Sequence, residues 1–308
     1  MENGSPAPGR LVTDILFNPL AARGNTAAVR RVLQLADSNG ASTTMVGVVP
    51  EPTRLERLAH GTEHVEQVLS AAHDDMRRRL DRCQPDDRAI PATVEIGSSS
   101  LSLIMRAIAA GHDLVAVTDD DDDDHDATIR RLLRKCPCPV WVIRPTRAST
   151  IRVLAAVDPQ PEEQELNEFV LDLAAHFAQA FDGELHVATA WQLYGESTLQ
   201  SSAFAHAADP DFVPRARART RQAHVDAVHA LTGDRPEPWE IHVEEGEASS
   251  VIRQVIDRER INILVMGTVA RAGLSGLVMG NTAERLVDTV GCSLVAVKPP
   301  GFVSPVLA

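Results

Sequence analysis

Cysteines and aromatic residues are scarce in this chain of 308 residues, and each shortage limits the classes of protein to which the chain can belong. Aromatic side chains make up 4% of the sequence, while Ala, Val, Leu and Ile are abundant, which favours helices packed on a sheet. The four cysteines show no spacing typical of a disulfide framework, so we expect a reducing compartment and a cytoplasmic location.

Long apolar runs are also missing. No stretch approaches the roughly 20 consecutive apolar residues that a membrane helix requires, so we expect no membrane partner. Residues 1–10 are rich in Gly, Pro and Ser and lack the apolar centre of a signal peptide. We expect this segment to form a disordered tail.

The third shortage is positive charge. The formal net charge is −13, from 43 acidic and 30 Lys or Arg residues. The densest basic group is Arg77–Arg79, and acidic residues flank it on both sides. Nucleic acids are bound through clusters of Lys and Arg that displace counterions, so we expect no nucleic-acid partner.

The sequence repeats its order of apolar segments, and this repeat dominates its organisation. The repeated segments of the first half are 14–19, 44–49, 94–97, 113–117 and 139–145. Their counterparts in the second half are 153–159, 185–190, 243–246, 262–266 and 293–299. The repeat predicts two domains, residues 11–148 and residues 149–308, with the boundary in the polar segment 146–150.

Each half alternates short apolar, β-branched runs with longer helical windows. This alternation predicts an α/β fold of two tandem doubly wound, Rossmann-like domains, each a mostly parallel five-stranded sheet with helices on both faces. Ligands of such sheets bind outside the carboxyl ends of the strands. The two halves differ in length after their fourth strand, so we expect them to differ in function there.

The second half has a glycine-rich loop at this position, from Gly267 to Gly280. Glycines let backbone amides approach an anion, and a helix predicted from about residue 283 to 290 adds the partial positive charge of its N-terminus. Asn281 and Thr282 can cap that helix or donate to phosphate, and Arg271 adds a cation. An ordinary glycine-rich connection with normal capping explains the same residues.

The loop resembles that of the ATP-binding branch of the universal stress protein family. The family pattern is Gly-x2-Gly-x9-Gly-[Ser/Thr], and the matching residues here are Gly267, Ala270, Gly280 and Asn281. Ala270 adds a Cβ where the family has glycine, and Asn281 replaces a hydroxyl, although Thr282 follows it. Together with the repeat, this pattern resembles the tandem, two-domain members of the family over nearly the whole chain.

The resemblance implies an adenine nucleotide alpha hydrolase-like fold and a nucleotide, ATP or a related one, in the C-terminal domain. The family has an Asp near the base and ribose, which we align with Asp158, and the strand that ends near Ala190 offers backbone groups to the base. Asp158 before a proline is equally consistent with a strand-end turn. The resemblance further implies that the two copies pair through 140–143 and 294–297 as a pseudo-dimer and that two chains form a homodimer.

We therefore expect a stress-response protein that acts as a sensor or binding module. No general base is evident near the expected phosphates, so we expect no fast enzyme, although slow ATP hydrolysis stays open. An alternative is an interaction scaffold or a binder of apolar ligands, because the insertion in the second half carries Trp191, Tyr194, Phe204 and Phe212. An adenylating enzyme would need a glycine-rich pyrophosphate loop after the first strand, which residues 158–160 do not supply.

The first half lacks the features of a nucleotide site. Asn18 is aligned with Asp158, and the segment 118–126 carries seven carboxylates, which would repel a triphosphate. This acidic loop is either solvated or a weak site for a hard cation. The spacing of His60 and His64 matches a zinc motif, but it falls where the repeat requires a solvated outer helix. We therefore expect no metal cluster.

Overall fold

The computed structural model describes residues 11–19, 26–119, 123–146, 148–195, 211–236, 238–268 and 279–307. Within these residues the strands are β1 (Asp14–Asn18), β2 (Ser42–Val49), β3 (Ala92–Ile96), β4 (Leu114–Thr118), β5 (Val140–Ile143), β6 (Arg152–Ala156), β7 (Glu184–Trp191), β8 (Trp239–Glu245), β9 (Ile263–Gly267) and β10 (Ser293–Val297). The helices are α1 (Thr26–Asn39), α2 (Arg54–His60), α3 (Thr62–Arg82), α4 (Ser99–Ala110), α5 (Asp123–Lys135), α6 (Gln164–Phe181), α9 (Phe212–Thr232), α10 (Ala248–Glu259) and α11 (Asn281–Thr289).

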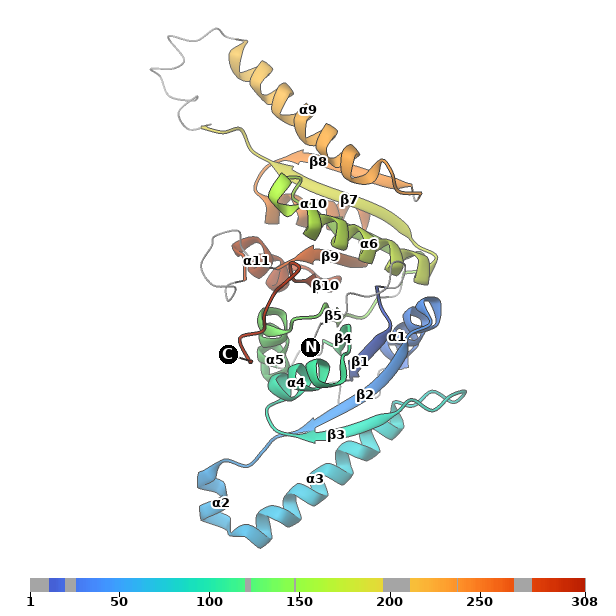
Figure 1. Cartoon of the computed structure of the whole chain (residues 1–308), viewed down its shortest axis with the longest axis vertical. Helices are drawn as coiled ribbons and strands as arrows, with labels where there is room; N and C mark the ends of the chain where they lie inside the picture. The colour runs from blue at the N-terminus through green and yellow to red at the C-terminus, as the bar shows by residue number, and fades with distance from the viewer. Residues whose placement is uncertain are drawn as a thin grey trace.

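The strands form one sheet in the order β3-β2-β1-β4-β5-β10-β9-β6-β7-β8 (Figure 1). Within each half all neighbouring strands are parallel, and the two halves have the same order. Strands β4 and β10 are buried at every position, as expected when helices cover both faces. The predicted doubly wound α/β fold is confirmed.

The two halves meet at an antiparallel pair of strands. Val142 of β5 lies opposite Leu294 of β10, and Trp141 lies opposite Val295. The pairing that the resemblance implied for these two segments is therefore present. The Trp141 ring is fully buried and packs edge-on against Phe177 of α6, with 4.9 Å between the ring centroids. Burial of these two large rings across the junction joins the cores of the halves.

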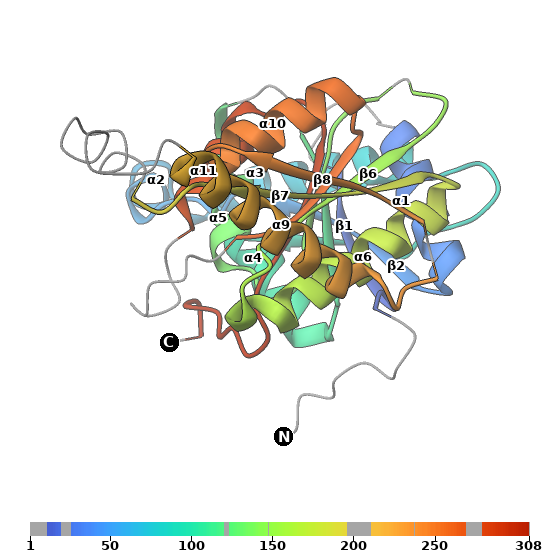
Figure 2. The same cartoon turned by 90° about the horizontal axis from the view of Figure 1, so that it is seen from above.

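Helices cover the sheet in two layers (Figure 2). The buried side chains of α1, α3, α6 and α9 belong to the core on one face. Those of α4, α5, α10 and α11 belong to the core on the other face. Because each half places helices on both faces, its first and fourth strands send their chains to opposite sides, which opens a crevice between them.

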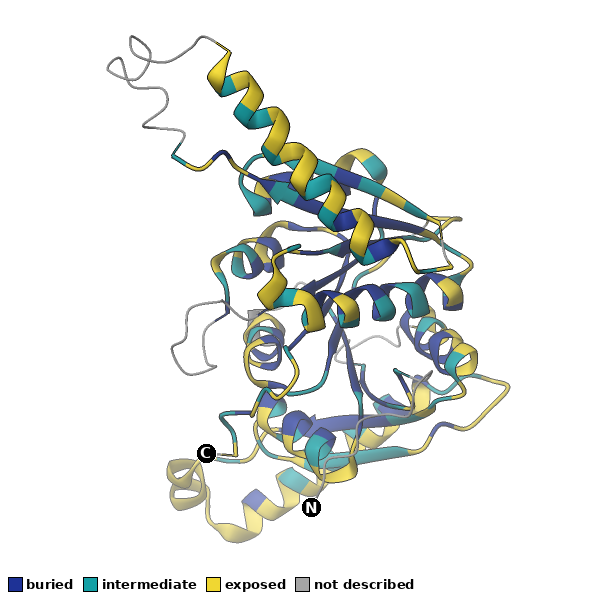
Figure 3. Cartoon of the chain, turned by 45° about the horizontal axis from the view of Figure 1, so that its top comes forward, coloured by how far each residue is buried: buried dark blue, intermediate teal, exposed yellow. Residues whose placement is uncertain are grey.

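The outermost helices are much less buried than the central ones (Figure 3). No residue of α2 is buried, and α9 buries only Val228 and Thr232 among its described residues. The described aromatic residues of the insertion, which the sequence offered for an apolar ligand, differ in their exposure. Trp191 is buried against the core, whereas Tyr194 is 98% exposed and Phe212 is 43% exposed. Phe204 lies outside the described residues.

The register between the halves corrects one alignment made from the sequence. Asn18 pairs with Val117 on β4, and its structural counterpart Ala156 pairs with Met266 on β9. Asp158 therefore lies two residues beyond the position of Asn18, and the statement that Asn18 replaces the Asp is wrong. Side chains alternate along a strand with a period of two, so a slip of two residues leaves the apolar pattern unchanged.

Two further predictions concern the limits of the domains. The boundary between residues 11–148 and 149–308 falls in the segment between β5 and β6 and stays a prediction. The tail predicted for residues 1–10 lies outside the described residues. In the part of the chain that the structure describes, no helix is both long and apolar enough to cross a bilayer.

Candidate functional site

The C-terminal half contains a cavity of about 430 Å³ at the carboxyl ends of β6, β7 and β9. It lies where α6 leaves β6 toward one face and α11 follows β9 on the other face, the crevice at which doubly wound sheets bind ligands. Six of the predicted site residues line this cavity, namely Asp158, Ala190, Gly267, Gly280, Asn281 and Thr282. The other two, Ala270 and Arg271, lie outside the described residues.

The two ends of the glycine-rich loop are joined by a backbone hydrogen bond. The Gly280 amide donates to the Thr268 carbonyl oxygen at 3.0 Å. Thr268 itself is buried, and its amide donates to the Val297 oxygen at 3.0 Å. A Cβ on Gly267 would lie 2.7 Å from Cδ2 of Leu166, so a larger residue at this position would require the Leu166 side chain to shift. These hydrogen bonds therefore fix the positions of Thr268 and Gly280, which are the described residues next to the loop.

Helix α11 begins at Asn281, two residues earlier than the predicted start at Ala283. Gly280 is the N-cap residue, and within the described part of the chain no side chain caps the helix. Asn281 and Thr282 belong to the first turn, so the prediction that they cap the helix is wrong. Gly280 is extended and its oxygen accepts the Glu284 amide at 2.9 Å, which starts the helix at Asn281. The amides from Asn281 to Ala283 therefore have no acceptor within the helix.

A second helix also starts at this cavity, but a carboxylate already occupies its end. Glu247 is the N-cap of α10, and its side chain accepts from the Ser250 amide at 3.0 Å. Hydrogen bonds from Ser249 and from the Ser250 amide hold the pKa of Glu247 below its ordinary value. Because Glu247 neutralises the start of α10, an anion in the cavity is best placed at the start of α11.

Asp158 is held at the end of β6 by a residue that the sequence analysis missed. Asn167 of α6 is 3% exposed. Its amide group donates to the Asp158 carbonyl oxygen at 2.6 Å, and its side-chain oxygen accepts from the Asp158 amide at 3.1 Å. This clamp fixes the turn after β6 and the place of the Asp158 carboxyl group. A lone Asn among the apolar positions of a predicted helix was the signal that could have identified it.

In the N-terminal half, two polar side chains at the carboxyl ends of β1 and β4 are bound within the protein. Asn18 is buried, and its side chain donates to the Val46 oxygen at 2.7 Å. Asp119 pairs with Arg144 at 2.6 Å. Helix α5 begins at Asp123, so residues 123–126 of the predicted acidic loop are helical, while residues 120–122 lie outside the described residues. Acidic residues in a first helical turn interact favourably with the helix dipole, which explains the difference.

The zinc-like His60 and His64 do not lie on one helix. His60 ends α2, and Gly61, with φ of 75°, separates it from α3. The two rings are 5.5 Å apart and exposed. The predicted solvated character of this segment is confirmed, but the predicted continuous helix is wrong because Gly61 interrupts it.

A family model described as the Universal stress protein family matches residues 151–298. The chain is 30% identical over 215 residues to universal stress protein E of Salmonella typhi, and the alignment covers 66% of this chain and 66% of that protein. For universal stress protein E of Photorhabdus laumondii the identity is 30% over 187 residues, which cover 58% of this chain and 57% of that protein. The matched segments thus span between 57% and 66% of these two relatives.

Two solved structures from Pseudomonas aeruginosa resemble the whole described fold. The protein PA1789 of strain PAO1, described as functionally unknown, has a TM-score of 0.66 and 25% identity, with 94% of this chain and 93% of that chain covered. A putative universal stress protein of strain UCBPP-PA14 has a TM-score of 0.64 and 25% identity, with 94% of each chain covered. The chain therefore belongs to the universal stress protein family and is similar in sequence to its members named universal stress protein E.

Proposed function

We propose that the C-terminal half of this stress-response protein binds a nucleotide such as ATP in the cavity between β6 and β9. The observation that carries the proposal is the start of α11, a helix N-terminus that no described side chain caps and that borders a cavity at the switch point of the sheet. The phosphates would lie against the amides of Asn281–Ala283, where the helix dipole favours negative charge.

The opposite wall of the cavity suits the nucleoside part of the ligand. Asp158 lies at the end of β6, where its carboxylate can accept hydrogen bonds from ribose hydroxyl groups. Ala190 at the end of β7 is small and leaves room for a base beside the backbone. Apolar side chains of Val170, Ile252 and Leu286 complete the lining and can contact the base.

We further propose that the protein acts as a sensor or binding module and not as a fast enzyme. Among the described residues that line the cavity, the titratable side chains are the carboxylates of Asp158 and Glu163. Fast phosphoryl transfer requires cations on the transferred group and a positioned nucleophile or base. With this lining, we expect ATP hydrolysis to be slow or absent.

Equilibrium dialysis with ATP tests the site, and one pair of variants locates it. Gly280→Asp introduces a favourable N-cap that also places a carboxylate where the phosphates would lie. Gly280→Asn offers a neutral cap of similar shape and is the matched control. We expect the Asp variant to bind ATP about tenfold more weakly than the Asn variant, because the two differ by one negative charge. Equal affinities, or no binding by the folded wild type at millimolar ATP, would reject the proposal.

The apolar lining supports a second candidate, which is an apolar ligand in the same cavity without a nucleotide. Native mass spectrometry of freshly purified protein distinguishes the two, because a co-purifying nucleotide and a co-purifying lipid differ in mass. A bound lipid together with failure to bind ATP would favour this second function.

We also propose that the protein is cytoplasmic and forms a homodimer. Strands β5 and β10 already pair within the chain, so a second chain must use another surface. Light scattering during size-exclusion chromatography measures the mass in solution. A monomer mass over a wide concentration range would exclude the dimer.

A further inference from the structure

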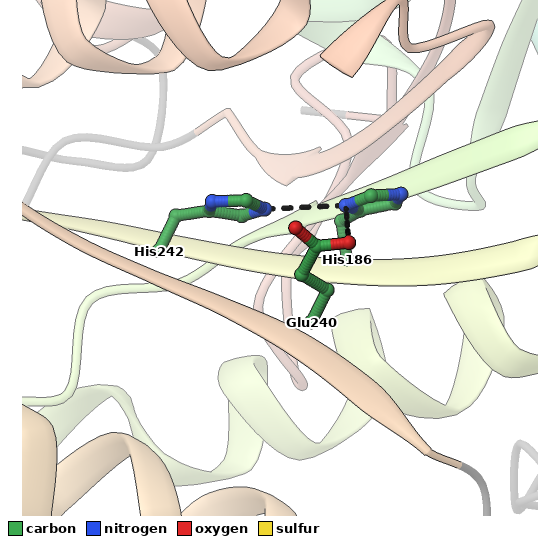
Figure 4. Close-up of side chains that lie close together, drawn as sticks. All are labelled: His186, Glu240 and His242. Atoms are coloured by element: carbon green, nitrogen blue, oxygen red, sulfur yellow. Dashed lines mark hydrogen bonds and ion pairs between the residues drawn. The ribbon is translucent and has the colours of Figure 1, made fainter.

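Three side chains that can bind a metal ion meet on the outer strands of the C-terminal half (Figure 4). His186 lies on β7, and Glu240 and His242 lie on β8. In the parallel register His186 is opposite Glu240, and His242 follows two residues later. Side chains two residues apart on a strand point to the same face, so the three residues share one face of the sheet. Helix α10 covers that face.

Two of the distances among these groups are close to those between the ligand atoms of a bound metal ion. Nδ1 of His186 is 3.1 Å from Nε2 of His242 and 3.6 Å from Oε2 of Glu240. One ligand atom from each of the three residues lies within 4.8 Å of the other two. Ligand atoms around a tetrahedral zinc ion, with bonds of about 2.0 to 2.2 Å, lie roughly 3.3 to 3.6 Å apart. The three atoms are therefore close to the spacing that one shared ion requires.

Hydrogen bonding alone does not satisfy this cluster. Arg258 lies 3.2 Å from Nδ1 of His242 and can only donate, so the proton of His242 is on Nε2 and points to His186. Nδ1 of His186 then accepts, which leaves the Glu240 carboxylate facing a nitrogen lone pair without a proton between them. The proton of His186 is on Nε2, which is buried and has no hydrogen-bond partner among the residues that the structure describes. A cation among the three ligand atoms would replace repulsion between lone pairs with attraction.

The charge of the surroundings also favours a cation. Burial lowers the pKa of both imidazoles below the ordinary value. The carboxylates that act on the two rings are those of Glu184, Glu240, Glu244 and Glu259. Two arginines oppose these negative charges. Arg258 pairs with Glu244 and Glu259, and Arg152 pairs with Glu184. The carboxylates therefore outnumber the cations around the cluster.

We propose that His186, Glu240 and His242 bind one transition-metal ion, for which Zn²⁺ is the best match. Two imidazoles and one carboxylate suit zinc, and a water molecule can supply the fourth ligand because the Glu240 side chain is 61% exposed. The ion would join the outer strand β8 to β7. The N-terminal half lacks this site, since the register places Thr44, Pro91 and Thr93 at the corresponding positions.

Metal binding through Nε2 moves the proton of His242 to Nδ1, where Arg258 now donates. The guanidinium must then move away, and a carboxylate of Glu244 or Glu259 can accept the new N–H. Arg258 therefore competes with the metal. We expect Arg258→Gln to raise the affinity for Zn²⁺ about tenfold, because Gln can accept this proton and carries no charge.

The test measures binding of Zn²⁺ and Co²⁺ to the full chain purified without a histidine tag. Elemental analysis after dialysis gives the stoichiometry, and the visible absorption of Co²⁺ reports a tetrahedral site. We expect one ion per chain. His242→Asn and Glu240→Gln should each weaken binding, by about 100-fold for the histidine. Glu240 is largely exposed, so its substitution should leave the fold intact, which thermal unfolding without metal checks.

His64→Asn is the matched control, because it disrupts the exposed pair with His60 that has zinc-like spacing in the sequence. We expect this variant to bind Zn²⁺ like the wild type. The proposal fails if the wild type shows no saturable binding, if binding survives both ligand substitutions, or if it is lost in His64→Asn. A fall in affinity in Arg258→Gln would contradict the assignment of Nε2 of His242 as a ligand.

Discussion

Arg144 and Lys298 hold equivalent positions just after β5 and β10, and each binds the end of the last helix of the opposite half. The Arg144 guanidinium donates to the Val290 oxygen at 2.6 Å, at the end of α11, and pairs with Asp119. The Lys298 ammonium donates to the Leu133 oxygen near the end of α5 and to the hydroxyl of Thr268. Cations at helix C-termini interact favourably with the dipole, so the two halves hold each other by reciprocal capping.

Because of Lys298, we expect the free energy of unfolding to increase at alkaline pH. Burial lowers its pKa from 10.5 to about 8. Below about pH 8 the amine is charged in both states, and the penalty for burying the charge is constant. Between about pH 8 and about 10.5 the unfolded chain binds a proton that the folded chain does not, so the free energy of unfolding increases with pH, by about 3 kcal/mol in total.

Urea unfolding of the wild type and of Lys298→Met at several pH values measures this effect. Other groups titrate in both proteins, so the difference between the two proteins isolates Lys298. We expect the wild type to gain about 3 kcal/mol relative to the variant over this range. Parallel curves for the two proteins would show that the lysine pKa is not lowered.

Arg144→Leu should destabilise the chain by about 3 kcal/mol, because the change leaves buried carbonyl oxygens and Asp119 without their donor. The matched control is Arg134→Gln. Arg134 also joins the two halves, through Glu284 at 2.8 Å, but both side chains are more than 40% exposed. Exposed ion pairs contribute about 0 to 1 kcal/mol, so we expect little change there. Equal losses in the two variants would refute the capping role of Arg144.

The clamp between Asn167 and Asp158 predicts a loss of both stability and nucleotide affinity. Asn167→Ala removes two hydrogen bonds to the backbone of Asp158. The Asp158 amide and carbonyl oxygen then stay partly buried without the Asn167 side chain as their partner. We expect about 1 to 3 kcal/mol of destabilisation in thermal or urea unfolding. If Asp158 contacts the nucleotide, dialysis should also show weaker ATP binding. An unchanged free energy of unfolding would mean that water replaces the amide.

The sequence predicted the order of elements well because a fold with two covered faces imposes apolar strands separated by helices. The match of Gly97 with Gly246 is confirmed in detail, since both have φ of 154° before a helix. The slip between Asn18 and Asp158 could not be detected, because a shift of two residues preserves the pattern of buried positions.

Contacts between distant segments were also beyond the sequence. His186 and His242 come together only through the register of β7 and β8, which no local spacing reveals. In the same way, the capping by Arg144 and Lys298 depends on the antiparallel contact of β5 and β10. Such sites consist of side chains that the topology brings together, so pattern analysis of single segments misses them.

The two buried histidines predict a loss of stability in acid when no metal is bound. Burial lowers the pKa of His186 and of His242 below the ordinary value of 6.5. As the pH falls below about 6.5, the unfolded chain binds protons that the folded chain does not bind, so the free energy of unfolding decreases.

Thermal unfolding at a series of pH values in the presence of a chelator measures this loss of stability. His242→Gln removes one titrating group, so its stability should fall less with decreasing pH than that of the wild type. His64→Asn changes an exposed residue, so its stability should fall in acid as that of the wild type does. Saturating Zn²⁺ should raise the melting temperature of the wild type near neutral pH and lose this effect in acid, because protons and metal compete for the same nitrogens. A loss of stability in acid that is identical in the wild type and His242→Gln would show that the imidazoles are not held neutral by the fold.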